Sequence, residues 1–359
     1  MKIAIFGAGQ LAMMMIQADS NDKHSFIVID PVFSPPASHY AEHIQSEYND
    51  TKTLERISKE CDVATIDFEN VDVSALKSLE KYIPVHPSSS ALEICQDRLK
   101  EKNLFKSLDI KTTTYFEINS MNDIDRHIDK SKDFILKSRR FGYDGKNQYR
   151  IKPYNNVETN LINSPCILEE LVDFKAEVSL ICLKTVKGET LFYPIIQNTH
   201  EDGILNVSIY PSNFSELQED AEMIGKKLLD SMDYIGVLVV EFFINQDGQL
   251  IANEMAPRVH NSGHWTIEGA NISQFSAHIK AITDGSINSP LKAKPSVMFN
   301  VLSRFIPENK IKKISEIVPI HLHDYHKTER ENRKLGHLTY TCDNKDTLEK
   351  NVNKIMKVF

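Results

Sequence analysis

The chain has 359 residues, of which 41% are hydrophobic and 26% charged, as is typical of a globular protein with roughly two or three domains. Its formal net charge of -8 argues against a nucleic-acid-binding face, because no basic surface dominates. Five dispersed cysteines without a C-x-x-C pair argue against a disulfide framework or a zinc site, and they fit a reducing compartment.

The first residues predict a strand, a glycine turn and a helix. No charged and then apolar leader precedes the strand at residues 3–6, and no apolar run is long enough to span a bilayer. We therefore expect a cytoplasmic protein without membrane contact.

The turn from Gly7 to Ala12 fits the G-x-G-x-x-A dinucleotide fingerprint, and Asp30 lies at the spacing of a ribose-binding acid. Apolar runs at 26–29 and 63–66 alternate with helices and predict a parallel sheet. Alone, this pattern favours an NAD(P)-dependent oxidoreductase. The glycines are needed for any tight turn from strand to helix, so this remains the second interpretation. Ser88 to Ser90 then predict the cap of a helix over 91–105.

A second unit begins near Thr112. Lys137 ends a short strand, and the loop from Gly142 to Gln148 contains two glycines and a lysine. Glycine lets backbone N–H groups approach phosphate oxygens, and lysine supplies a point charge, so the loop resembles a lid over nucleotide phosphates. A surface β-hairpin turn is the alternative.

Further strands are expected at 166–172, 177–183 and 191–197, followed by a helix over 216–229. Residues Glu169 to Val172 could present backbone groups to an adenine edge, and Glu177 could accept the ribose hydroxyls. The alternative is an edge strand with solvated acids. His200, in a polar turn, could contact a phosphate, although a lone loop histidine is usually just exposed.

Residues 236–264 hold the strongest site pattern. Strands at 236–244 and 250–254, joined by a turn at Asp247-Gly248, predict a hairpin that places Glu241 beside Glu254. Two carboxylates with the adjacent Asn253 suit Mg²⁺, which prefers oxygen ligands. The alternative is a solvated loop with an incidental acidic pair. The segment 253–264 concentrates polar side chains, namely Glu254, Arg258, His260, Asn261, Ser262 and His264.

The region after Lys292 predicts short strands and turns and a final helix over 347–356. Its basic cluster at Lys327 and 330–337 could hold a substrate phosphate, with a solvated charge run as the alternative. His321 and His323 share a strand face without a third ligand, so no metal is predicted there.

Several motifs together carry a family resemblance: Pro-Arg-Val-His-Asn-Ser-Gly-His-Trp-Thr at 257–266, Gln-Asp-Arg at 96–98, Arg-Arg-Phe-Gly-Tyr-Asp-Gly at 139–145, His-Glu-Asp-Gly-Ile at 200–204 and Ser-Gln-Phe at 273–275. The chain resembles the ATP-grasp superfamily and, within it, the 5-(carboxyamino)imidazole ribonucleotide synthetases over essentially its whole length. The resemblance implies an α/β fold with a Rossmann-like domain at 1–98, a lid domain at 99–172 and a C-terminal ATP-grasp domain with a substrate-binding subdomain at 173–359.

The reaction that the resemblance implies is the ATP- and bicarbonate-dependent carboxylation of 5-aminoimidazole ribonucleotide in purine biosynthesis. Carboxyphosphate is the intermediate, and ADP and phosphate are released. The resemblance further implies one or two Mg²⁺ ions and a cytoplasmic homodimer. Another ATP-grasp ligase, such as a formate-using transformylase, and a catalytically silent subunit are alternatives that the retained motifs disfavour.

Residue roles follow from the resemblance by matching position. ATP would be bound by Arg98, Lys137, Gly142, Tyr143, Asp144, Gly145, Lys146, Asn147, Gln148, Glu169, Glu170, Leu171, Val172, Glu177, His200, Asn253 and Glu254. Glu241 and Glu254 would hold the metal. The ribonucleotide side would comprise Glu69, Arg258, His260, Asn261, Ser262, Lys327 and Arg333. Arg258, Tyr143, Asp144 and Lys327 would be the catalytic residues.

The chain departs from the family pattern at four places. Asp67 replaces the first glutamate of Glu-x-Glu, and Asn147 replaces the last lid glycine. Glu331-Asn332 replaces Pro-Gly, which predicts a more mobile loop before substrate binds. Ala12 replaces a glycine of the first turn, which we interpret as a fold relic and a substrate-side backbone contact.

Overall fold

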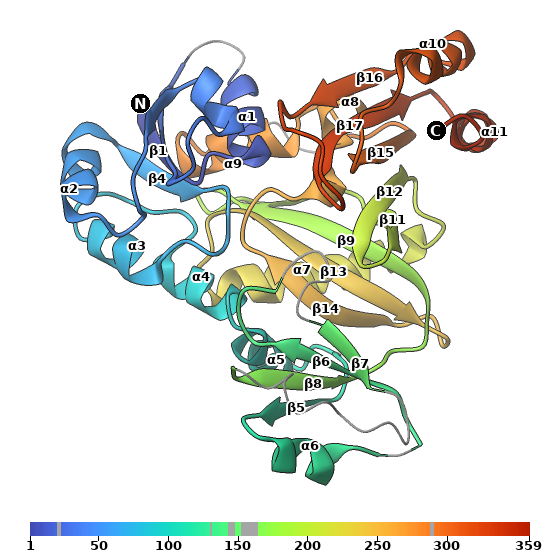
Figure 1. Ribbon diagram of the computed structural model, residues 1–359, viewed down its shortest axis with the longest axis horizontal. Helices are drawn as coiled ribbons and strands as arrows, with labels where there is room; N and C mark the ends of the chain where they lie inside the picture. Colours follow the sequence, from blue (N-terminus) through green and yellow to red (C-terminus); the bar gives the residue numbers. More distant parts are fainter. Residues whose placement is uncertain (20–22, 130, 143–147, 152–163, 288–290) are drawn as a thin grey trace.

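The computed structural model describes residues 1–19, 23–129, 131–142, 148–151, 164–287 and 291–359. Three sheets organise these residues, as Figure 1 shows: an N-terminal sheet at the upper left, a lid sheet at the bottom and a long central sheet between them. Among the described residues, no helix is long and apolar enough to cross a membrane.

The N-terminal sheet is parallel, in the order β3-β2-β1-β4, as the alternating pattern predicts. Residues Ile3 to Phe6 are fully buried, which is typical of a parallel strand covered on both faces. The elements of this unit are β1 Lys2–Phe6, α1 Gln10–Gln17, β2 Ser25–Ile29, η1 Pro36–His39, β3 Glu42–Ile44, α2 Thr51–Glu60, β4 Val63–Ile66, α3 Val73–Leu79 and α4 Ser89–Cys95.

The lid sheet is antiparallel, in the order β5-β8-β6-β7. Its small core gathers Phe134, Leu136 and Leu168 against α6. The elements from the connecting helix onward are α5 Arg98–Ser107, β5 Tyr115–Ile118, α6 Met121–His127, β6 Phe134–Ser138, β7 Gln148–Ile151 and β8 Cys166–Glu170.

The central sheet has nine strands, in the order β14-β13-β9-β11-β12-β15-β17-β16, and β10 pairs with β9. Its first strands are β9 Phe174–Lys184, β10 Thr190–Phe192, β11 Ile196–Glu201, β12 Ile204–Tyr210, β13 Gly236–Asn245 and β14 Leu250–Ala256. Its helices and remaining strands are η3 Ser215–Leu217, α7 Gln218–Ser231, η4 Asn261–Gly263, α8 Thr266–Gly269, α9 Gln274–Ile282, β15 Ser296–Leu302, α10 Glu308–Ile317, β16 His321–Asp324, β17 Lys334–Thr341 and α11 Lys345–Met356.

The two faces of β9 explain where the central sheet is polar. Leu180 and Cys182 point into the core shared with α7 and α5. On the other face, Ile181 and Leu183 join the core beneath α9 and α1. Because side chains alternate along a strand, Ser179 lies on this second face, immediately beyond its apolar part.

The structure corrects two predicted elements and adds helices such as α10. The single helix expected over 91–105 is two, because Asp97 leaves the helical path and its carboxylate accepts the Leu99 amide at the start of α5. The strand expected at 191–197 is divided between β10 and β11. Helix α10 was not predicted; its charged sequence buries only Ile314 fully.

Candidate functional site

The predicted carboxylate hairpin is confirmed as a structural feature. Glu241 on β13 and Glu254 on β14 are direct cross-strand partners, and the turn uses Gly248 at φ +82°. Burial, together with the charge of Glu254, raises the pKa of Glu241 to about 7. Burial also opposes the charge of Glu254, but Arg98 outweighs it and lowers the pKa of Glu254 to about 2. The pair therefore combines one firmly ionised carboxylate with one that a cation would help to ionise.

Two cations from the lid side line the same cavity as these carboxylates. Arg98 Nη1 lies 2.7 Å from Glu254 Oε2, and Lys137 Nζ lies 3.0 Å from Glu169 Oε2. Arg98 is at the start of α5 and Lys137 is on β6, so the lid unit and the hairpin supply opposite charges to one place. Burial opposes the charge of Glu169, but neighbouring lysines and Arg98 lower its pKa to about 2.

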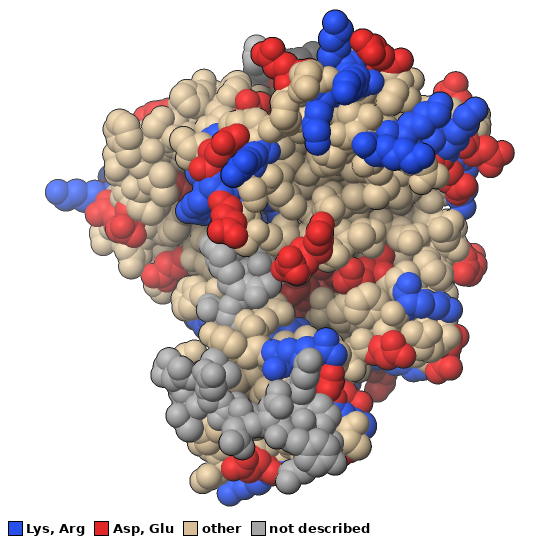
Figure 2. All heavy atoms as spheres, turned by 45° about the vertical axis from the view of Figure 1, so that its right-hand side comes forward, with Lys and Arg blue, Asp and Glu red and all other residues tan. Residues whose placement is uncertain are grey.

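A cavity of about 190 Å³ lies where the lid and central sheets meet. Figure 2 shows a hollow at this junction with acidic side chains inside it. Most of the lining was predicted as a nucleotide or metal site. The lining residues predicted for the nucleotide or metal are Arg98, Lys137, Gln148, Glu177, His200, Glu241, Asn253 and Glu254. His260 and Asn261, which were predicted for the ribonucleotide side, line the same cavity.

His200 is held in this cavity by Glu177. The two side chains meet at 2.8 Å, through Nδ1 of the histidine and Oε2 of the carboxylate. Burial opposes protonation, but the bond to Glu177 and the charge of Glu241 together raise the pKa of His200. A histidine whose protonation is favoured in this way, beside a polar cavity, suits contact with an anion.

Two amides in the lining lack protein partners among the described residues. The buried Asn253 Oδ1 accepts no hydrogen bond, and neither Oδ1 nor Nδ2 of Asn261 has a partner. Buried polar atoms normally find partners, so these atoms are suited to a ligand. Glu241, Glu254 and Asn253 Oδ1 provide the oxygen donors that Mg²⁺ prefers, and nucleotide phosphates would complete its coordination. The described residues contain no cluster of three or more histidine, cysteine or acidic side chains suited to a metal.

The predicted substrate side lies between the N-terminal unit and the central sheet. Arg258, after β14, forms an ion pair with Glu69, after β4. Lys327 Nζ donates to Gln10 Oε1 at 2.5 Å, which joins the basic loop to the first glycine turn. Arg333 Nη1 bonds the backbone oxygen and the hydroxyl of Thr328 within its own loop.

His260 and Ser262 are neighbours in the same segment. Their side chains meet at 2.9 Å, through Nδ1 and Oγ. Burial, together with the nearby charge of Arg258, lowers the pKa of His260 well below its usual range. His260 is therefore a neutral group near Glu241, to which its Nε2 lies at 3.7 Å.

The acids of the first turn support the backbone. Asp30 Oδ2 accepts the Ala8 amide at 2.9 Å, and Asp67 Oδ2 accepts the amides of Gly9 at 2.7 Å and Ala12 at 3.3 Å. A Cβ on Gly7 would lie 1.7 Å from Asp67 Oδ1, so glycine is required there. Both oxygens of Asp30 thus accept backbone amides, Oδ2 from Ala8 and Oδ1 from Val32.

Other predicted nucleotide residues have mixed outcomes. Glu170 forms an ion pair with Lys132 at 2.8 Å, and the Leu171 amide donates to Asp133, so these groups have partners within the lid. Gly142 and Val172 are described but do not line the cavity. The predicted lid residues Tyr143, Asp144, Gly145, Lys146 and Asn147 lie outside the described residues.

Sequence reasoning missed two lysines of this region. Lys334 lines the cavity, although the sequence placed it in a basic run beside a substrate phosphate. Lys102 is 1% exposed, and its Nζ donates to the Asn253 carbonyl at 2.7 Å. No local pattern identifies Lys102, because its partners on β14, Ala252 and Asn253, lie about 150 residues away.

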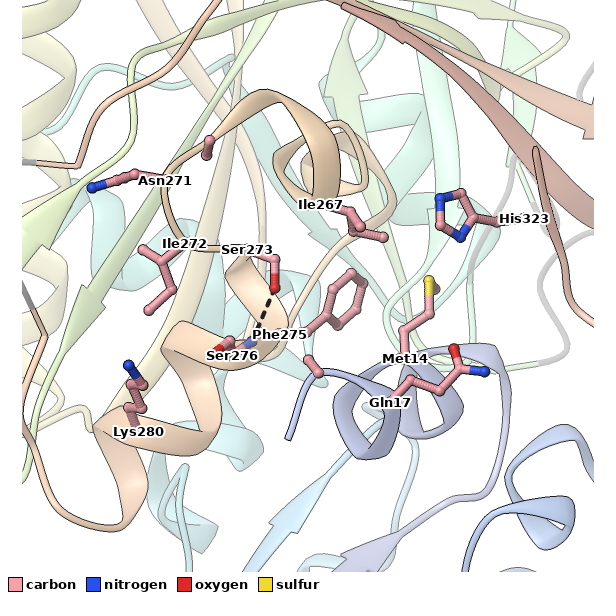
Figure 3. Close-up of a pocket in the computed structure, with 12 residues that line it drawn as sticks. Met14, Gln17, Ile267, Asn271, Ile272, Ser273, Phe275, Ser276, Lys280 and His323 are labelled. Carbon is pink, nitrogen blue, oxygen red and sulfur yellow. Dashed lines mark hydrogen bonds between the residues drawn. The ribbon is translucent and has the colours of Figure 1, made fainter. Parts of the chain in front are cut away.

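A larger cavity, of about 450 Å³, lies between α1 and α9 (Figure 3). Its lining includes Met14, Phe275 and Ile267, with Lys280 and His323 as the ionisable groups, and no carboxylate. None of the predicted site residues lies there. The smaller cavity is therefore the candidate site, because the predicted charged residues line it and none of them lines the larger cavity.

Comparison with protein-family models divides the chain into three consecutive matches. Residues 1–96 match the ribonucleotide synthetase preATP-grasp domain, and residues 103–275 match the ATP-grasp domain. Residues 296–351 match the phosphoribosylaminoimidazole carboxylase C-terminal domain.

Individual relatives match along nearly the full chain. The N5-carboxyaminoimidazole ribonucleotide synthase of Pseudomonas aeruginosa is 38% identical, with 99% of this chain and 98% of the relative covered. A solved Staphylococcus aureus N5-carboxyaminoimidazole synthetase complexed with ADP has a TM-score of 0.91 at 34% identity, covering 99% of this chain and 96% of that one. An Aspergillus clavatus synthase in complex with ADP and 5-aminoimidazole ribonucleotide has a TM-score of 0.85 at 26% identity, covering 99% and 98%.

Proposed function

The chain belongs to the N5-carboxyaminoimidazole ribonucleotide synthase family, and we propose that it carboxylates 5-aminoimidazole ribonucleotide with bicarbonate and ATP. It is an ATP-dependent ligase with the ATP-grasp fold. The products of the proposed reaction are the N-carboxylated ribonucleotide, ADP and phosphate, as a step of purine biosynthesis.

The observation that carries the proposal is the convergence of Glu241 and Glu254 with Arg98 and Lys137 around one cavity between the lid and the central sheet. Phosphoryl transfer needs positioning and charge neutralisation more than covalent help from the protein. A metal-binding acid pair facing two phosphate-binding cations meets that need.

We assign the nucleotide to this cavity. Arg98, Lys137 and His200 would contact its phosphates or base, and Glu177 would accept the ribose hydroxyls. Mg²⁺ would be held by Glu241 and Glu254 with Asn253 beside them, where it would neutralise charge on the transferring phosphoryl group. The loop from Gly142 to Gln148 would close over the phosphates, with Tyr143 and Asp144 reaching the ribonucleotide.

The ribonucleotide is assigned to the adjoining space between the N-terminal unit and the central sheet. Bicarbonate would be phosphorylated by ATP, and carboxyphosphate would release CO₂ beside the attacking amine. Arg258 would stabilise the anionic intermediate, and its orientation by Glu69 supports this role. Lys327 and Arg333 would hold the substrate phosphate, with Lys327 positioned by Gln10.

Three broader assignments accompany the reaction. We propose domain boundaries at 1–98, 99–172 and 173–359, a cytoplasmic location and the family's homodimer.

The test is ADP release from Mg·ATP and bicarbonate, measured with and without 5-aminoimidazole ribonucleotide. The proposal predicts release that depends strongly on the ribonucleotide. Release that ignores it would indicate a different ATP-grasp ligase.

A further inference from the structure

A buried line of polar side chains crosses the central sheet and ends at His260. Ser208 Oγ donates to Asn198 Oδ1 at 2.8 Å, and Asn198 Nδ2 donates to Ser179 Oγ at 3.0 Å. Ser179 Oγ donates to Ser262 Oγ at 2.9 Å, and Ser262 Oγ meets His260 Nδ1 at 2.9 Å. The three serines are fully buried and Asn198 is 5% exposed. The bonds from Ser208 to Ser262 are buried, and the last bond, to His260, is partly buried.

The direction of the line is fixed at its His260 end. The backbone N–H of Ser262 points to His260 Nδ1 at 3.3 Å. A backbone N–H can only donate, so Nδ1 is an acceptor and carries no proton. The Ser262 hydroxyl must then donate its single proton to Nδ1.

The same reasoning continues outward from Ser262. With its proton used, the Ser262 oxygen can only accept, so Ser179 is the donor. With the Ser179 proton also used, the side chain of Asn198 must present its NH₂ group to Ser179 and its carbonyl oxygen to Ser208. Each side chain therefore has one orientation that satisfies all of its neighbours.

We propose that Ser179 and Asn198, acting through Ser262, are positioning residues that hold His260 in the tautomer with its proton on Nε2. This nitrogen lies 3.7 Å from Glu241 Oε1, in the wall of the candidate cavity. Ser179 is also the cross-strand partner of Glu241, so one strand pair places both the acid and the support of the histidine. His260 thus presents a fixed N–H donor, and not a lone pair, toward the Glu241 carboxyl group.

A purely structural role explains these residues less well. The next two residues on this face of β9, Ile181 and Leu183, are apolar. Three adjacent strands nevertheless carry a buried hydroxyl or amide here, although apolar side chains would fill the same space without any need for partners. The orientation of His260, at the end of the line, accounts for these buried polar side chains.

The tautomer can be measured directly by long-range ¹H–¹⁵N correlation NMR on protein labelled with ¹⁵N-histidine. His260 is assigned by the signals that disappear in His260→Gln. The proposal predicts an unprotonated Nδ1 and a protonated Nε2 in the unliganded wild type. A protonated Nδ1, or averaging of the two tautomers, would overturn it without any variant having to fold.

The variant that tests the role is Asn198→Asp. An ionised aspartate can only accept, so the Ser179 hydroxyl turns toward it and the Ser262 hydroxyl turns toward Ser179. Nδ1 of His260 then keeps only the 3.3 Å bond from the Ser262 backbone N–H, and the proton is shared between Nδ1 and Nε2. We expect kcat of the ribonucleotide-dependent reaction to fall about 10-fold or more, with little change in KM for ATP. The matched control is Asn300→Asp, because Asn300 is 1% exposed in the same sheet and donates to the Leu205 carbonyl. The control should destabilise the fold comparably while leaving the His260 nitrogen shifts unchanged.

A folded Asn198→Asp protein with wild-type kcat, or with the tautomer unchanged, would refute the positioning role. The catalytic consequence rests on the proposed function, but the NMR result does not. If the protein shows the predicted tautomer but no ribonucleotide-dependent ADP release, the inference about the hydrogen-bonded line stands and the proposed function is refuted.

Discussion

Glu254 is the residue on which most of the proposed chemistry converges. It is paired with Glu241 across the hairpin, with Arg98 across the cavity, and it is next in sequence to Asn253, whose Oδ1 has no partner among the described residues. Its low pKa keeps it ionised throughout the neutral range. A permanently charged oxygen ligand at this position suits a divalent ion.

Replacing Glu254 should therefore remove ATP turnover. In Glu254→Ala the metal loses a ligand, and we expect turnover to fall by about 100-fold or more. Circular dichroism should show an intact fold. Glu254→Gln removes the charge but keeps the size of the side chain and an acceptor oxygen for Arg98. This variant should be similarly inactive. The exposed Glu201→Ala is the control on the neighbouring β11, and normal turnover in Glu254→Ala would refute the metal assignment.

The role of Lys327 depends on a contact with a residue that is far away in the sequence. It contacts Gln10, which lies 317 positions earlier, and so connects the basic loop to the first glycine turn. Lys327→Ala should raise KM for the ribonucleotide by about 10-fold or more, through loss of a charge-assisted phosphate contact, and leave KM for ATP little changed. Lys345→Ala, at the far helix α11, is the charge-matched control. An unchanged KM for the ribonucleotide would argue against the phosphate role.

At the scale of elements, the burial of Asp67 beneath the first turn makes the stability of the fold depend on pH. Asp67 accepts two amides of the turn, yet burial raises its pKa from 3.8 to about 7. The folded protein then holds a proton that the unfolded chain has lost, so the contribution of Asp67 to stability falls as pH rises from about 4 to about 7.

Asp67→Asn removes that titration and keeps an acceptor oxygen for the turn. We expect the stability of the variant, relative to wild type, to increase as pH rises from about 4 to about 7. Urea unfolding at a series of pH values measures this difference. A difference that is constant with pH would show that Asp67 titrates normally in the folded protein.

Sequence patterns predicted the helices and strands that are determined by residues close together in the sequence. The hairpin of β13 and β14 follows from two β-rich runs around Asp247-Gly248, and that pattern alone placed Glu241 beside Glu254. The break between α4 and α5 was missed because Asp97 stabilises a new helix start through its own side chain, inside a segment with continuous helical character.

Local sequence patterns did not predict the side-chain contacts that complete the site. Lys102 reaches Asn253, and Asn198 reaches Ser179, only after the strands and α5 have packed together. Their sequence neighbours give no periodicity or turn signal for these bonds. The larger part of the site was instead identified through family motifs, whose residue roles remain proposals.

At the scale of the whole molecule, the candidate nucleotide cavity lies where the lid unit meets the central sheet. Arg98 and Lys137 come from the lid side, and Glu241 and Glu254 come from the central sheet. A ligand that binds both should favour the folded state by mass action. We expect Mg·ADP to raise Tm, with a smaller effect when EDTA removes the metal, as measured by differential scanning fluorimetry. Equal shifts with NAD and with Mg·ADP would contradict the assignment of the cavity to ATP.

The central claim is that this chain couples ATP hydrolysis to one ribonucleotide. The most direct measurement is ADP release from Mg·ATP and bicarbonate in the presence and absence of 5-aminoimidazole ribonucleotide. Our account predicts fast release only when the ribonucleotide is present. Equal release in both reactions, or none in either, would contradict it.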